Sequence, residues 1–390
     1  MSSNPLYASY VIHLIAEAEH TDNDYARIAI YDEILDALQD TPAIYGCVLA
    51  DAVLPVEDYL RLRPERYEQI ALFAQQGRLE FGPWFVEGGN TSVEMTIRNL
   101  QMGVSTLELL RAPVVTAALP PDAHAQMPQI LRGFGIEASI TPTGRAAEIF
   151  SGADGSTINV FAAPYLDEID WEQSRATTPG RHLMARVRGR PHDWLRALDS
   201  ISSKADEPFL SSRASMVNVM DLQGMPVIPK TGVVPGTPAG NLLLHQVEPA
   251  MVWAAYEGSA PLKSPQRIAQ TVWRDYLRSQ PERAAVDVAR LLELYPDDGV
   301  ISNMFSVESD GFAVCAVKLR DDGQPGIILR GINPTGDAHP VTLRAWRHFS
   351  RCAVVRLDET RTGAGLPIAD GKVQFTSNPH RITTLWLHDG

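Results

Sequence analysis

Residues 81–90 read Phe81-Gly-Pro-Trp-Phe-Val-Glu-Gly-Gly-Asn90, an apolar run that ends in a carboxylate, two glycines and an amide. The apolar run predicts a buried β-strand over residues 78–86, and the glycines predict a loop directly after it. Glycine has no side chain, so the backbone there can approach a ligand closely. In folds built on parallel strands, ligands bind at the carboxyl ends of the strands. We therefore expect Glu87 and Asn90 to face a cleft.

Strand-like and helix-like segments alternate on both sides of this stretch. Apolar runs predict strands over residues 10–15, 44–49, 114–119 and 137–141. Apolar residues at helical spacing predict helices over residues 25–38, 64–76, 94–110 and 127–133. Gly77 is placed to end the second of these helices. This rhythm is typical of a parallel sheet or barrel with helices outside it.

Beyond residue 223 the sequence predicts first a linker with helices and then a region of β-strands. Eight of the 17 residues from 224 to 240 are Pro or Gly, which predicts a linker, and residues 242–256 and 265–294 are expected to be helical. Beyond residue 300, apolar runs between turns predict an antiparallel β-sandwich. The expected fold class is thus multidomain α/β + α + β. It comprises a (β/α) barrel-like domain over residues 1–223, a linker and short helical domain over 224–298, and a C-terminal β-sandwich domain over 299–390.

Composition narrows the class of partner. A chain of 390 residues is expected to hold two or three domains, and its net charge of -13 argues against nucleic acid or an acidic membrane surface. The three cysteines are far apart and odd in number, which favours a reducing compartment over a disulfide framework. The sequence shows neither a signal peptide nor an apolar run long enough to cross a membrane. We expect a cytoplasmic protein.

An acidic segment follows the first predicted strand. Glu17, Glu19, His20, Asp22 and Asp24 place five ionisable groups within eight residues. Carboxylate and imidazole groups of this kind are ligands for Zn²⁺ or a similar ion. A solvated acidic loop has the same composition and needs no function. Both interpretations stay open at this point.

The second cluster is Trp84 with Glu87 and Asn90. A Trp face offers a flat apolar platform, and Glu and Asn offer hydrogen bonds to hydroxyl groups, a combination that suits a sugar ring. A buried Trp followed by a polar loop is the alternative. Arg98, on the next predicted helix, is interpreted either as a substrate contact or as a member of a structural ion pair.

The third cluster follows the strand that ends in Pro120-Pro121. Asp122 and His124 lie between this strand and the helix predicted from residue 127. An aspartate there suits a nucleophile or a metal ligand. It equally suits the N-terminal cap of that helix.

Taken in order, these stretches resemble glycoside hydrolase family 38, the α-mannosidases. The resemblance is carried by Gly77-Arg78, Trp84-Phe-Val-Glu87, Glu94-Met-Thr-Ile-Arg98 with Gly103, and Ala125-Gln-Met-Pro-Gln-Ile-Leu131. It continues through Arg330-Gly-Ile-Asn-Pro334, Val354-Val-Arg-Leu-Asp-Glu359 and Pro379-His-Arg-Ile-Thr-Thr-Leu385. The chain is short for the family, with the region between residues 141 and 224 trimmed.

The resemblance implies a metal-dependent, retaining hydrolase, but the metal motif departs from the family pattern. Glu17 and Glu19 stand where the family has histidines, and Asp22 lies one place beyond the position of its aspartate. Asp122 matches the catalytic nucleophile, which is also a metal ligand in the family. The expected metal ligands are Glu17, Glu19, Asp22 and Asp122. The expected sugar contacts are Trp84, Glu87, Asn90, Arg98 and His124.

These departures all fall on the metal site, which predicts weakened or lost catalysis. We therefore expect an α-mannosidase-like protein that binds a mannose-containing glycan or glycoside with weak or no hydrolysis. An active retaining α-mannosidase with unusual ligands and a structural subunit assembling through its β domain are the alternatives. The cofactor is unknown, with Zn²⁺ or another divalent cation expected if the site is intact. Neither nucleic acid nor membrane is an expected partner, and homo-oligomerisation stays open.

Overall fold

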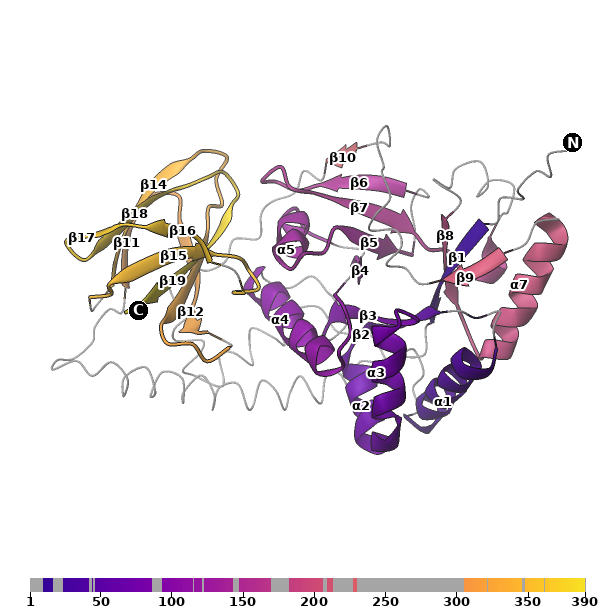
Figure 1. The fold of residues 1–390 in the computed structure, drawn as a ribbon. Coiled ribbons are helices and arrows are strands. Elements are labelled where there is room, and N and C mark those ends of the chain that lie inside the picture. Colours follow the sequence, from indigo (N-terminus) through magenta and orange to yellow (C-terminus); the bar gives the residue numbers. More distant parts are fainter. Residues whose placement is uncertain are drawn as a thin grey trace, which may run out of the picture.

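The structure, a computed structural model, is shown in Figure 1. It describes residues 10–16, 24–41, 44, 46–85, 93–114, 116–120, 123–142, 147–169, 182–205, 209–212, 227–229, 305–320, 322–345, 348–360 and 362–389. The helices predicted over residues 242–256 and 265–294 lie outside the described residues, as does most of the predicted linker.

The first sheet confirms the predicted alternation of strands and helices. Its strands are all parallel and run in the order β3-β2-β1-β8, with β9 also paired to β1. They are β1 (Tyr10–Ala16), β2 (Cys47–Ala52), β3 (Leu79–Trp84), β8 (His182–Val187) and β9 (Phe209–Ser212). The helices of this part are α1 (Asp24–Asp40), α2 (Leu54–Leu62), α3 (Tyr67–Gln75) and α7 (Pro191–Ala205).

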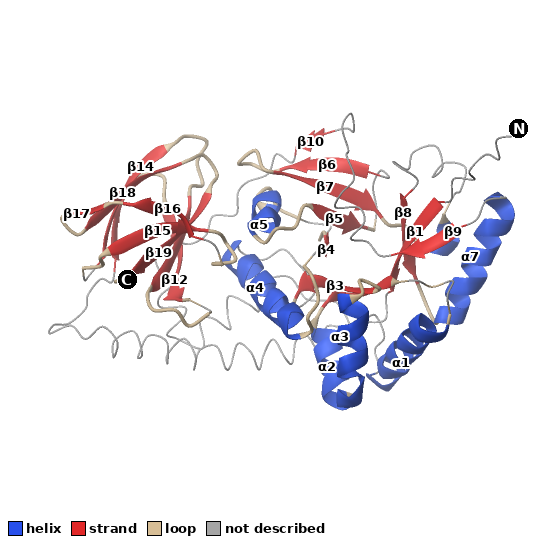
Figure 2. Ribbon diagram, in the orientation of Figure 1, coloured by secondary structure: helices blue, strands red, loops and turns tan. Residues whose placement is uncertain are grey.

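Successive side chains of a strand point to opposite faces of the sheet, and the helices cover one of these two faces. Leu14 and Ala16 of β1 pack with α1, α2, α3 and α7 in one buried cluster, whereas Ile15 packs in another cluster on the opposite face. Each strand therefore needs apolar residues on both faces, and β1 supplies them with Leu14, Ile15 and Ala16 in succession. Figure 2 shows these helices gathered on one side of the sheet. Gly77 ends α3 with a φ of 65°, a conformation that favours glycine, as predicted.

The second sheet has the order β10-β6-β7-β5-β4. Its strands are β4 (Thr116–Ala118), β5 (Ala138–Thr141), β6 (Ala147–Ser151), β7 (Thr157–Ala162) and β10 (Val227–Pro229), and they are parallel except for the β6–β7 pair. Helices α4 (Val93–Leu109) and α5 (Met127–Gly133) accompany it. β10 falls within the predicted linker and pairs with β6.

The inner faces of the two sheets share a buried cluster. Ile15 and Val48 from the first sheet pack there with Ile140 and Phe161 from the second. The parallel α/β class is thereby confirmed. Closure of the strands into a barrel stays a prediction, because the hydrogen bonds define two separate sheets.

The C-terminal part consists of two antiparallel sheets, in the orders β11-β14-β18-β17 and β12-β13-β19-β15-β16. The first contains β11 (Phe305–Glu308), β14 (His339–Ala345), β17 (Ile368–Ala369) and β18 (Lys372–Ser377). The second contains β12 (Ala313–Leu319), β13 (Ile327–Ile332), β15 (Arg351–Val355), β16 (Thr362–Leu366) and β19 (Ile382–His388). Leu329 and Leu385 of the second sheet share a core with Val341 and Leu343 of the first. The expectation of antiparallel sheets is confirmed.

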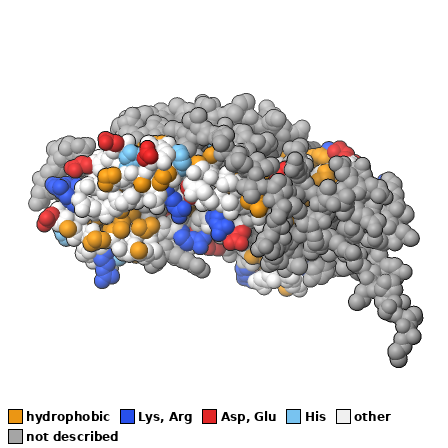
Figure 3. Space-filling model, turned by 90° about the horizontal axis from the view of Figure 1, so that it is seen from above, with side chains coloured by type: hydrophobic (Ala, Val, Ile, Leu, Met, Phe, Trp, Pro, Cys, Tyr) orange, Lys and Arg blue, Asp and Glu red, His pale blue; other side chains and the backbone are white. Residues whose placement is uncertain are grey.

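Seen from above in Figure 3, the described side chains of the C-terminal sheets mix hydrophobic, acidic and basic types on one face. Among the helices that the structure describes, none combines the length and the apolar character that crossing a bilayer requires.

Candidate functional site

The carboxyl ends of β2, β3 and β4 meet at one edge. Val53 N, just after β2, donates a hydrogen bond to Trp84 O at the end of β3, at 2.8 Å. The indole Nε1 of Trp84 donates to Ala118 O at the end of β4, also at 2.8 Å. Parallel α/β folds bind ligands at such an edge. The candidate site is therefore the edge where β3 and β4 end together.

Most of the predicted site residues follow these strands directly in the chain. Glu17, Glu19 and Asp22 come after β1, Glu87 and Asn90 after β3, and Asp122 after β4. All six lie outside the described residues, so their roles stay predictions. Within the described ranges, no group of three or more His, Cys, Asp or Glu side chains could hold a metal ion.

Trp84 is part of the core. It is 1% exposed and packs with Val93, Ile97 and Leu100 of α4 and with Ala117 of β4. Its ring therefore joins β3, β4 and α4, which is the buried-Trp alternative considered for the sequence. Contact with a sugar stays a prediction. Trp84→Ala would be a poor test of sugar contact, because replacing a buried Trp by Ala lowers the free energy of unfolding by about 3–5 kcal/mol. A loss of binding would then reflect a loss of folded protein.

His124 lies in the turn that leads into α5. The turn is held by Ala123 N donating to Pro120 O at 3.0 Å and by Met127 N donating to His124 O at 3.0 Å. Gln126 N donates to Nδ1 of His124 at 3.3 Å. The residue at the N-cap of α5 is Gln126. Asp122 lies outside the described residues, so its interpretation as a cap, a nucleophile or a metal ligand stays a prediction.

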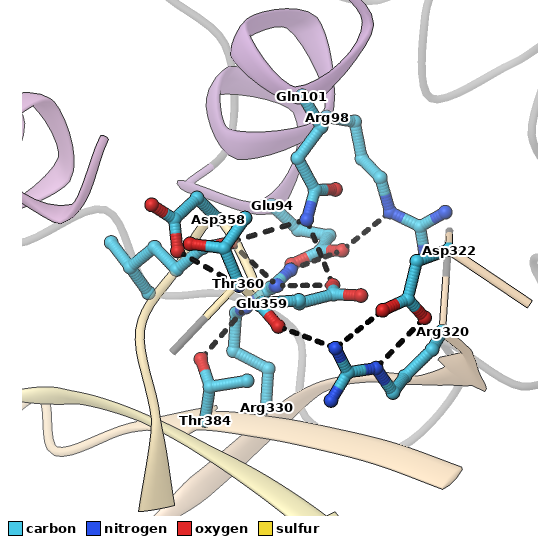
Figure 4. Close-up of polar contacts among 11 residues, drawn as sticks. Glu94, Arg98, Gln101, Arg320, Asp322, Arg330, Asp358, Glu359, Thr360 and Thr384 are labelled. Carbon is cyan, nitrogen blue, oxygen red and sulfur yellow. Dashed lines mark hydrogen bonds and ion pairs between the residues drawn. The ribbon is translucent and has the colours of Figure 1, made fainter. Parts of the chain in front are cut away.

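Arg98 forms an ion pair at the start of α4. Its Nε lies 2.7 Å from Oε1 of Glu94, one helical turn earlier. Glu94 is buried and also receives two hydrogen bonds from Arg330 of β13, at 2.9 and 2.7 Å. Figure 4 shows the two arginines converging on this carboxylate. Arg98 thus occupies a structural ion pair, and a contact with substrate stays a prediction.

The buried guanidinium of Arg330 binds further groups of the C-terminal sheet. Its Nη2 lies 3.1 Å from Glu359 Oε1, and its Nε donates to Thr384 Oγ1 at 3.1 Å. Glu359 Oε1 also accepts from Gln101 Nε2 of α4 at 2.8 Å. Two carboxylates and two guanidinium groups are thereby brought together out of water. We call Glu94, Arg98, Gln101, Arg330, Glu359 and Thr384 the Arg330 cluster.

Electrostatics follow from this geometry. Burial alone would raise the pKa of Glu94, but the adjacent cations of Arg330 and Arg98 outweigh burial and hold that pKa below its ordinary value. Burial alone would lower the pKa of Arg330, but Glu94 and Glu359 outweigh it and raise that pKa. Both groups are therefore charged at neutral pH, and the cluster is a set of ion pairs.

A pH titration tests this charge state. Because the folded pKa of Glu94 is lowered, its stabilising effect is complete above its unfolded pKa, about 4.3, and is lost as pH falls through the folded pKa. We expect the difference in unfolding free energy between wild type and Glu94→Gln to shrink below about pH 4. Urea unfolding across the acid range measures it. A difference that is constant with pH would show that Glu94 is not ionised in the fold.

Further polar contacts hold the C-terminal sheet against α4 and α5. The Gln129 amide both accepts from Ile382 N and donates to Ile382 O, at 3.3 and 3.4 Å, as a neighbouring strand would. Arg356 donates twice to the carbonyl of Gly133 at the end of α5, at 3.2 and 3.0 Å. Ile332, Leu357 and Ile382 add apolar contacts to the cluster that contains Trp84.

The sequence interpretation did not assign this interface, although a signal for it existed. Arg330 is a charged residue inside an otherwise apolar strand, and such a residue is rarely buried unless it is paired. The blocks that carried the family resemblance supply both sides of the contact: Glu94 meets Arg330, and Gln129 meets Ile382. In this structure those blocks hold the two parts of the chain together.

This fold, with its parallel sheets followed by two antiparallel sheets, is similar to that of solved glycoside hydrolase family 38 structures. A protein in this family from Enterococcus faecalis matches with a TM-score of 0.52 at 15% sequence identity, covering 98% of this chain and 54% of its own. An alpha-mannosidase from Enterococcus faecalis V583 matches with a TM-score of 0.55 at 14% identity, covering 98% and 56%. The resemblance predicted from the sequence is thereby confirmed at the level of the fold.

A sequence relative points the same way. A protein named "Putative mannosylglycerate hydrolase" from Halalkalibacterium halodurans is 31% identical over 130 residues, which cover 31% of this chain and 14% of that protein. No family model matches the chain. The chain spans about half the length of the two Enterococcus structures.

Proposed function

We propose that this chain binds a mannose-containing glycan or glycoside at the carboxyl ends of β1, β3 and β4, with weak or no hydrolysis. The observation that carries the proposal is the hydrogen bond from Trp84 to Ala118, which joins the ends of β3 and β4. The chain continues from that edge into Glu87 and Asn90 on one side and Asp122 on the other. Carboxylates and an amide are the groups that orient sugar hydroxyls.

The candidate donor set suggests which cation could take part. Glu17, Glu19, Asp22 and Asp122 offer only oxygen, which suits a hard cation such as Ca²⁺ or Mg²⁺ better than Zn²⁺. A bound cation would hold sugar hydroxyls in place. Without a cation, clustered carboxylates repel one another and their pKa values rise. Sugar affinity should therefore depend on the divalent cation supplied.

Hydrolysis places a further demand on the site. A retaining glycosidase needs two carboxyl groups about 5–5.5 Å apart, one as nucleophile and one as acid and base. Asp122 is the candidate nucleophile, and the sequence offers no matching general acid. Losing acid–base assistance costs about 10²–10⁴-fold in rate. Binding is therefore the better-supported activity.

Calorimetric titration of the full chain with methyl α-mannoside, with and without Ca²⁺ or Zn²⁺, tests the proposal. Mannosylglycerate is a second ligand to titrate, because the Halalkalibacterium relative is named for it. We expect Asp122→Asn and Glu87→Gln to weaken binding at least about tenfold, which corresponds to about 1.4 kcal/mol. Glu108→Gln, at an exposed position of α4, should leave binding unchanged.

An aryl α-mannoside assay on the same samples separates the alternatives. Turnover that disappears in Asp122→Asn would replace the proposal with an active mannosidase. A wild type that binds neither ligand under any cation condition would leave a structural role and end the sugar-binding proposal.

A further inference from the structure

The C-terminal sheet carries a groove far along the chain from the candidate sugar site. The groove is about 720 Å³ and lies over β15 and β16. Its floor contains Ala353 and Gly365, which are paired directly across the two strands. Trp386, the partner of Ala353 on the other side, lines the groove beside them. Its size is within the range of about 300–1,000 Å³ that is usual for small-molecule sites.

One wall of the groove is rigid and aromatic. The rings of Trp386 and His388 stack with centroids 3.8 Å apart and an interplanar angle of 14°. The guanidinium of Arg320 lies 4.3 Å from the centroid of the Trp386 ring, and Trp386 Nε1 donates to Pro325 O at 3.2 Å. Trp386 is therefore fixed in place before any ligand arrives. A fixed wall reduces the entropy that a ligand would lose on binding.

The groove carries an available positive charge. Arg351 lines it and is exposed, and among the ion pairs of the described residues none includes Arg351. The carboxylate of Asp389, near the chain end, accepts a hydrogen bond from Ser350 N at 3.4 Å. A guanidinium offers planar, bidentate recognition of a carboxylate. In a chain of net charge -13, a cation that faces a groove is a specific feature.

The remaining polar groups suit hydroxyls. Gln324, Ser350 and His388 line the groove beside Arg351. Burial, with the neighbouring cations Arg351 and Arg320, lowers the pKa of His388, so its imidazole is neutral at pH 7 and can exchange hydrogen bonds with a hydroxyl. Burial raises the pKa of the Cys352 thiol to about 12, so that group stays protonated and unreactive.

From this geometry we propose that the groove binds a small hydroxylated carboxylate of the sugar-acid class. The carboxylate pairs with Arg351, the ring lies over Ala353 and Gly365, and its hydroxyls meet Gln324 and His388. This site is independent of the one proposed at the strand ends. It makes the C-terminal sheet a ligand-binding surface.

Two variants of the full chain test the proposal without strain on the fold. Arg351→Gln removes the charge at an exposed position. Gly365→Val fills the floor, and its site tolerates a side chain because a Cβ added there would lie 3.9 Å from the nearest heavy atom, Cys352 O. A Cβ at Gly363 would instead lie 2.7 Å from Val354 O, so that position is avoided. Arg344→Gln, exposed on β14 of the other sheet, is the matched control.

Glucuronate is the probe, with glucose and acetate as its neutral and sugar-free counterparts. We expect glucuronate to bind wild type at least about tenfold more tightly than glucose or acetate does, and each groove variant to lose at least about tenfold in affinity. Arg344→Gln should bind as wild type does, and thermal unfolding should confirm that all variants are folded. Acetate binding equal to glucuronate would reduce the site to a simple anion site and overturn the proposal. So would no measurable glucuronate binding, or variants that bind as wild type does.

Discussion

Arg330→Met is expected to lower the free energy of unfolding by about 3–5 kcal/mol, as removal of one partner from a buried ion pair does. Methionine fills much of the space but leaves Glu94 and Glu359, whose side chains are 6% and 5% exposed, without their shared cation. Urea or guanidinium unfolding of the full chain measures the loss.

The matched control is Arg190→Met. Arg190 pairs with Glu33 at 2.7 Å, but both side chains are exposed, at 54% and 38%, so its loss should cost about 1 kcal/mol or less. Adding Glu94→Gln to Arg330→Met should restore part of the stability, because one unpaired charge is then removed. If Arg330→Met costs no more than Arg190→Met, the Arg330 cluster does not hold the two parts of the chain together.

Gly103→Ala should be the second large effect. Gly103 of α4 faces the end of β3 so closely that an added Cβ would lie 1.9 Å from Pro83 O and 2.7 Å from Phe85 N. These are backbone atoms, so the helix must move away from the strand. Overpacking of this kind costs about 1–3 kcal/mol, which outweighs the gain of about 1 kcal/mol that alanine brings to a helix interior.

Ser105→Ala provides the comparison on the same helix. Ser105 is exposed, so its replacement should change the unfolding free energy by less than about 0.5 kcal/mol. Denaturant unfolding of both variants measures these changes in the free energy of unfolding. A Gly103→Ala protein that is as stable as wild type, or more stable, would contradict the close contact between α4 and β3.

Local patterns were sufficient where local physics sets the structure. The helix predicted over residues 127–133 matches α5, because its Pro and Gly mark both ends in the sequence. Gly77 was predicted as the end of α3 for the same reason. Helix α2 was not predicted. Its N-cap, Val53, makes no side-chain capping hydrogen bond, and Pro55 and Glu57 in its first turn were start signals that the sequence interpretation left unused.

Long-range contacts could not be predicted from local pattern. Glu94 and Arg330 are 236 residues apart, and the sequence around one residue does not indicate that the other is its partner. The same holds for Trp84, whose burial depends on β4 and α4 together. For the candidate site, the strand ends were predicted and found, and the joining of β3 and β4 at Trp84 was not anticipated. The assignments of Glu17, Glu87 and Asp122 stay predictions.

The central claim is that the segments following β1, β3 and β4 form one sugar site. A crystal structure of the full chain grown with methyl α-mannoside and Ca²⁺ tests it most directly. We predict sugar density at the edge where Trp84 meets Ala118, in contact with Glu87, Asn90 or Asp122. Sugar bound elsewhere, or the three segments on separate surfaces at saturating ligand, would contradict the account.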